Sequence, residues 1–65
     1  IDPINEISGI QARLNNLGFY FGAIDGVMGP KTGAALKAFQ KKYDLKESGQ
    51  ADEATRKKLL DVHGC

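Results

Sequence analysis

The chain has 65 residues, of which 42% are hydrophobic, and a formal net charge of +1. A domain of this size buries only roughly 60% of the surface that its unfolded chain exposes, so we expect one small core and no deep cleft. No apolar run approaches the roughly 20 residues of a membrane-spanning helix, and the near-neutral charge argues against nucleic-acid binding.

A single domain is expected over residues 1–65, with its core at about 7–62. The sequence begins without methionine and without a leader of the secretory type. We therefore interpret it as a module excised from a larger protein, and we expect it to be a monomer.

The first predicted helix begins near Ser8, which has the spacing of a capping box with Gln11; Asn5 is an alternative start one turn earlier. Gly18 follows the last apolar position and predicts a left-handed C-terminal cap. The helical periodicity gives one apolar stripe, formed by Ile7, Ile10, Leu14 and Leu17.

Residues 19–29 are predicted to form a loop, with three aromatic residues at one end and three glycines spread through it. Asp25 and Gly26 form a strong turn dipeptide, since aspartate can bond its own backbone and glycine accepts a positive φ.

The second helix is predicted to begin at Pro30, because proline suits the first helical position. The third is predicted to begin after Asp52 as N-cap and to end at Gly64. Their expected apolar faces comprise Ala34, Ala35, Leu36, Ala38, Phe39 and Tyr43 in the second helix, and Ala51, Leu59, Leu60 and Val62 in the third.

Residues 25–36 are echoed by residues 48–59, a constant 23 positions later. Each copy places a threonine at the third helical position, where we expect its hydroxyl to bond the backbone of the cap residue. The matched pairs include Gly26 with Gly49, Thr32 with Thr55, and Leu36 with Leu59. The sequence thus predicts an all-α fold, a compact three-helix bundle with an internal loop–helix repeat.

No catalytic or metal site is apparent in the sequence. His63 is the only histidine and lies near the C-terminal end of the sequence, and with Cys65 it falls short of the four ligands of structural zinc. The glycines of residues 25–29 precede a helix as a phosphate-binding loop would, but no strand precedes them and the Walker spacing is absent. We expect no enzyme activity, metal or cofactor, and no role for Cys65.

An ordered set of motifs covers most of the chain: residues 10–19, Gly22, Asp25-Gly26, residues 29–32 and 34–36, Phe39-Gln40, Leu45, Gly49 and residues 52–55. From about 7 to 60, this set resembles the peptidoglycan-binding domain of the three-helix type, a noncatalytic module found beside cell-wall amidases and other lytic enzymes. The resemblance implies that the chain binds cell-wall polymer and targets a fused catalytic domain to it.

The resemblance further implies a location in the bacterial cell envelope or periplasm, or outside the cell, as part of a larger protein. The alternative is a protein-interaction or scaffolding module in a secretion or phage-derived assembly. No membrane or nucleic-acid partner is expected.

The ligand would be either the glycan strand or the stem peptide of peptidoglycan. A glycan calls for an exposed aromatic ring and planar polar groups, and a stem peptide calls for charges opposite carboxylates and ammonium groups. Structural roles are the alternatives: Gln40 satisfying loop backbone, Asp25 forming its turn, and Tyr20 or Phe21 in the core. The candidate ligand-binding residues are Arg13, Asn16, Tyr20, Phe21, Asp25 and Gln40.

Overall fold

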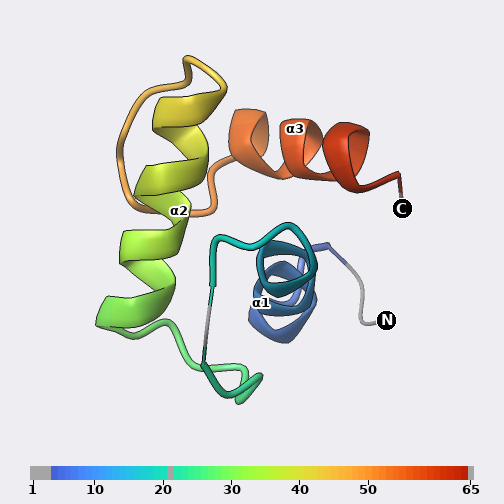
Figure 1. Ribbon diagram of the computed structural model, residues 1–65, viewed down its shortest axis with the longest axis vertical. Coiled ribbons are helices and arrows are strands. Elements are labelled where there is room, and N and C mark those ends of the chain that lie inside the picture. The colour runs from blue at the N-terminus through green and yellow to red at the C-terminus, as the bar shows by residue number, and fades with distance from the viewer. Residues whose placement is uncertain (1–3, 21, 65) are drawn as a thin grey trace.

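Three helices joined by two loops form the protein in the computed structural model, which describes residues 4–20 and 22–64 (Figure 1). They are α1 (Ile7–Asn16), α2 (Pro30–Lys42) and α3 (Glu53–His63). Helix α1, seen end-on in Figure 1, contacts both α2 and α3. The described residues contain no strand, and the prediction of an all-α domain with three helices is confirmed.

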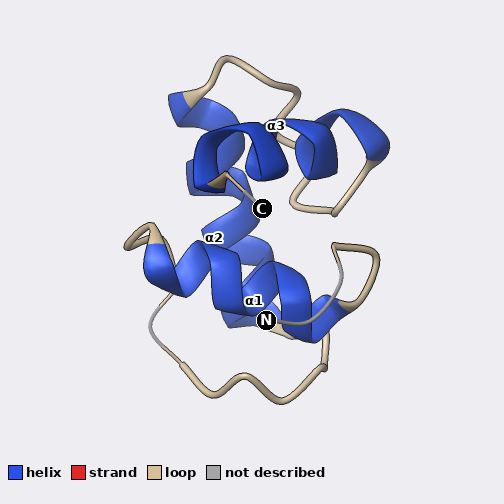
Figure 2. Cartoon of the chain, turned by 90° about the vertical axis from the view of Figure 1, so that its right-hand side faces the viewer, coloured by secondary structure: helices blue, strands red, loops and turns tan. Residues whose placement is uncertain are grey.

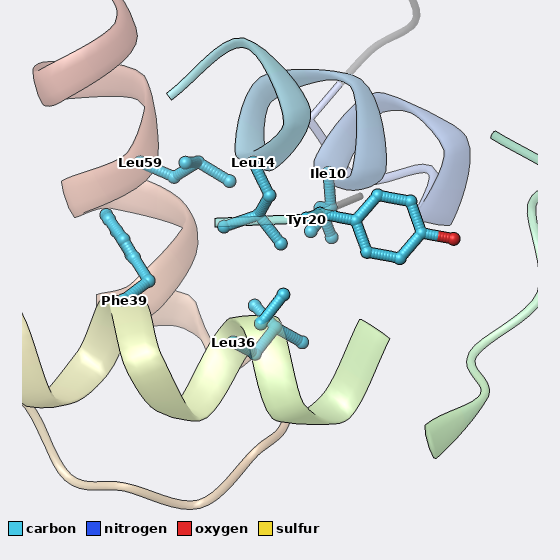
Figure 3. Packing of buried hydrophobic residues seen from close by; sticks show 7 residues of the cluster. Ile10, Leu14, Tyr20, Leu36, Phe39 and Leu59 are labelled. Carbon is cyan, nitrogen blue, oxygen red and sulfur yellow. The ribbon is translucent and has the colours of Figure 1, made fainter. Parts of the chain in front are cut away.

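The core lies where the three helices meet. Figure 3 shows Leu36 rising from α2 toward Leu14 and Ile10 of α1, while Phe39 points from α2 toward α3, which contributes Leu59. The Phe39 ring meets the Phe19 ring edge-on, with centroids 5.5 Å apart. The expected apolar face of α2 is correct for Ala35, Leu36 and Phe39, but Ala34 and Ala38 are exposed because they lie on the far side of the helix.

The helix starts agree with the sequence for α2 and α3 and differ for α1. Pro30 is the first residue of α2, and the Asp52 carboxylate caps α3 by accepting the Thr55 N–H at 3.0 Å. Helix α1 begins at Ile7 without a side-chain cap. The predicted capping box is therefore wrong: Ser8 lies inside the first turn, and Gln11 is fully buried.

Helices α1 and α2 end in the same way. The N–H of Phe19 donates to the Leu14 carbonyl at 2.8 Å, and the N–H of Leu45 donates to the Gln40 carbonyl at 2.8 Å. Gly18 has the predicted left-handed conformation, with φ 86°. In α2 the equivalent residue is Asp44, with φ 59°, and its Cβ makes this conformation costly.

Replacing Asp44 with glycine should stabilise the protein. Asp44→Gly relieves the left-handed strain, against a smaller loss from the greater freedom of glycine in the unfolded chain, for a net gain of about 0.5–1 kcal/mol. Urea unfolding followed by circular dichroism would measure this gain. Asp44→Ala, which keeps the Cβ, is the control and should not stabilise; equal midpoints for the Gly and Ala variants would contradict the explanation.

Candidate functional site

The first loop, residues 17–29, is held against the helices by one buried side chain. The Gln11 amide oxygen accepts the Gly26 N–H at 3.0 Å. Its amide nitrogen lies 3.0 Å from each of three acceptors: the Asp25 carboxylate, the Val27 carbonyl and the Thr32 hydroxyl. Since the nitrogen carries two hydrogens, these acceptors share them. Gln11 thus joins α1, the loop and the first turn of α2.

Gln40 holds the second loop, residues 43–52, with a corresponding set of bonds. Its oxygen accepts the Gly49 N–H at 3.0 Å. Its nitrogen donates to the Ser48 hydroxyl, the Gln50 carbonyl and the Thr55 hydroxyl at 3.1, 2.9 and 2.8 Å. Each partner stands 23 positions after its counterpart in the Gln11 network. The two networks correspond partner for partner, while the sequence repeat itself stays a prediction.

The predicted role of the two threonines is wrong in its detail. The hydroxyls of Thr32 and Thr55 accept from Gln11 and Gln40, and Thr55 also donates to the Asp52 carboxylate. They face buried glutamines because the loops fold back over the first turn of α2 and of α3.

The two loops differ at the cap position. In α3 the Asp52 carboxylate accepts both the Thr55 N–H and the Ser48 hydroxyl, each at 3.0 Å. The position 23 residues earlier is Gly29, and α2 has no side-chain cap. A pocket of about 410 Å³ opens here, lined by Tyr20, Ala23, Asp25, Val27, Gly29, Pro30, Lys31 and Thr32.

The loop that forms this pocket carries exposed apolar side chains. Ile24, Val27 and Met28 are 43%, 61% and 42% exposed, and they are the large hydrophobic residues that the described part of the chain leaves exposed. Figure 2 shows residues 22–29 running along the outside of the helices, at the bottom of the view. Apolar side chains gathered beside a pocket are typical of a binding surface.

Tyr20 forms the inner wall of the pocket. Its ring is only 4% exposed, and its hydroxyl, which points away from the core residues in Figure 3, donates to the Ala23 carbonyl at 2.6 Å. A Cβ on Gly22 would lie 3.0 Å from this hydroxyl, so a larger residue at position 22 would have to displace the Tyr20 side chain.

A family model described as "Putative peptidoglycan binding domain" matches residues 4–59. The chain belongs to this family. A spore cortex-lytic enzyme of Oceanobacillus iheyensis is 44% identical over 57 residues, which is 88% of this chain and 21% of the enzyme. The N-acetylmuramoyl-L-alanine amidase CwlM of Mycobacterium tuberculosis is 38% identical over 55 residues, 85% of this chain and 14% of the amidase.

A third relative has a name of a different kind. The "Putative OxPP cycle protein OpcA" of Nostoc punctiforme is 51% identical over 45 residues, 69% of this module and 10% of that protein. The matched part of the chain therefore spans between 10% and 21% of the length of these three curated relatives. No solved structure matches it.

Two loop carboxylates, those of Asp25 and Asp52, have a lowered pKa. For Asp25 the main cause is the Val27 N–H, followed by the Gln11 amide. For Asp52 it is the Thr55 hydroxyl, followed by the Thr55 N–H. Hydrogen bonds to the ionised form favour that form, so both groups are negatively charged at neutral pH.

The structure places the predicted site residues in different parts of the fold. Tyr20 and Asp25 both line the pocket. Asn16 lies elsewhere, at the end of α1, where its amide nitrogen is 3.1 Å from His63 Nε2. Arg13, 4% exposed, donates to the Gly9 carbonyl. Phe21 falls outside the described residues.

Gln40 has no exposed surface and holds the second loop, which agrees with the alternative that it satisfies loop backbone. The prediction missed Lys31 and the exposed Ile24, Val27 and Met28. No sequence signal marked these three, since residues of the same loop such as Tyr20 are buried.

Other kinds of site find no support in the part of the chain that the structure describes. Residues 4–20 and 22–64 hold no group of three or more histidines, cysteines and acidic residues placed to bind a metal ion. None of their helices has the length and apolar character needed to cross a membrane.

Acid should destabilise the module through these carboxylates. Their pKa lies below the ordinary value of 3.8 in the folded state, so the unfolded chain takes up protons first as the pH falls. Stability should be constant above about pH 5 and decline as the pH falls through and below about 4. Urea midpoints measured from pH 7 to pH 2 would show this decline.

The contribution of Asp52 can be separated with Asp52→Ser. Serine still caps a helix but does not titrate, so this variant should stay folded and have a shallower acid decline than the parent. An unchanged decline would remove Asp52 from the explanation.

Proposed function

We propose that this module binds peptidoglycan in the pocket beside the first loop, and that it localises an attached protein domain to the bacterial cell wall. The family to which the chain belongs supports peptidoglycan as the ligand. The exposed apolar loop supports the pocket beside it as the binding site. The observation that carries the proposal is the contrast between the two loops, which have corresponding supporting networks but differ in their surfaces.

The first loop presents aliphatic side chains to solvent, whereas the exposed residues of the second loop are polar or charged, as in Lys46, Glu47 and Gln50. Exposed aliphatic groups weaken solubility and add little to a small core, so a ligand surface explains their presence in the first loop. The buried glutamine fixes the backbone beneath them, which lowers the entropy lost when a ligand binds.

The proposed module is noncatalytic. Its lytic relatives extend far beyond it, since the matched parts cover 21% and 14% of the cortex-lytic enzyme and the amidase. The module would act by raising the concentration of an attached catalytic domain at the wall. Its place would be the cell envelope, the periplasm or the outside of the cell, as a monomeric unit of a larger protein.

A second candidate function is binding to a protein partner. The observation in its favour is the 51% identity with the OxPP cycle protein, whose name contains no reference to the cell wall. The same apolar loop would then contact a protein surface, and a module with this function would not bind to purified wall.

Sedimentation with purified sacculi tests the proposal directly. The parent chain should pellet with sacculi, and the double variant Val27→Ser/Met28→Ser should bind at least tenfold more weakly, because it removes exposed apolar contact area without disturbing the core. Ala34→Ser/Ala38→Ser, which alters exposed positions of α2, is the control and should bind normally. A parent chain that stays wholly in the supernatant at low salt would contradict wall binding.

The two glutamines offer a matched pair that separates stability from binding. Gln11→Met and Gln40→Met each leave a loop N–H and a threonine hydroxyl without the amide partner, and each should lose about 1–3 kcal/mol of stability. Only Gln11→Met should weaken sacculus binding, measured at a temperature where circular dichroism shows both variants folded. Equal binding by the two variants would place the ligand away from the first loop.

A further inference from the structure

The pocket beside the first loop combines apolar surface with two opposite charges. Ala23, Val27 and Pro30 supply aliphatic surface, while the Asp25 carboxylate and the Lys31 ammonium supply the charges. We infer that this pocket takes the stem peptide of peptidoglycan, with a peptide carboxylate at Lys31, rather than the glycan strand. The inference rests on the proposed function and names the part of the wall polymer that is bound.

Tyr20, the aromatic residue of the described pocket lining, does not suit a sugar. Stacking on a pyranose needs an exposed ring face, but Tyr20 is almost wholly buried and its hydroxyl is bonded to Ala23. Tyr43 lies at the opposite end of α2, half-buried, with its ring against Phe39 and beneath the Lys58 ammonium. The small aliphatic side chains of the pocket fit the methyl groups of alanine residues in a peptide better than they fit the hydroxyls of a sugar.

The charges of the pocket match those of a short peptide. Asp25 is ionised at neutral pH, and its two hydrogen bonds, from Gln11 and Val27, both end on Oδ1. Its Oδ2 is therefore able to accept from a peptide ammonium. Lys31, the other charged residue of the pocket lining, is exposed, and its ammonium can bind a carboxylate.

Separate preparations of glycan strands and stem peptide test which part of the wall polymer is bound. The chain should pellet with intact sacculi, should bind a synthetic stem tetrapeptide in solution by calorimetry, and should lose affinity at least tenfold when the carboxylates of that peptide are amidated. Glycan strands stripped of stem peptides by an amidase should not bind. Equal binding to stripped strands and intact sacculi would overturn the peptide assignment while leaving wall binding in place. Failure to bind intact sacculi would instead overturn the proposed function.

Two lysine variants test the role of the Lys31 ammonium. Lys31→Ala should weaken tetrapeptide binding about tenfold and reduce its salt dependence, because one charge contact is removed. Lys41→Ala removes an exposed charge from the same helix, outside the pocket lining, and should have no effect. Equal affinities for these two variants would contradict a role for Lys31.

Discussion

Two buried glutamine side chains hold this fold together. A domain with three short helices and no described strand has few ways to satisfy the polar backbone of its loops, and an unpaired buried group costs about 1–3 kcal/mol. Gln11 and Gln40 each supply one acceptor and one donor group to a whole loop. In the described residues, no buried side-chain nitrogen or oxygen lacks a hydrogen-bond partner. The apolar core packs between loops whose shape these amides determine.

This arrangement explains how a small domain can present apolar residues without collapsing around them. The first loop is anchored through its turn, by Gly26 and Asp25, and through the hydroxyl of Thr32 at the start of α2. Val27 is held at its carbonyl, so its side chain is left outside. The pocket therefore depends on the backbone path of the loop, which the buried amide fixes.

The sequence was sufficient where structure depends on local chemistry. Pro30 and Asp52 mark helix starts because their effects act within one turn, and Gly18 marks a helix end for the same reason. It was insufficient where a side chain crosses between elements. Gln11 has the spacing of a capping residue, and only the packed loop shows that it is buried. Arg13, a predicted ligand-binding residue, is almost wholly buried and donates to the Gly9 carbonyl of its own helix, which the sequence did not indicate. Such long polar side chains have several possible partners, and tertiary packing decides among them.

The contrast between Gly29 and Asp52 connects stability with function in this fold. A carboxylate at the cap position of a helix contributes about 1 kcal/mol compared with an uncapped residue, and a glycine retains part of that benefit. Helix α3 uses this contribution, and α2 does without the side-chain bond although its loop has the same supporting network. The residue that faces the cap position accounts for the difference. In the second loop the Ser48 hydroxyl donates to Asp52, whereas the first loop has Asp25 at the place of Ser48. A carboxylate at position 29 would face the ionised Asp25, so aspartate would not stabilise α2 as it stabilises α3. Gly29 avoids this repulsion and leaves the pocket beside the first loop open.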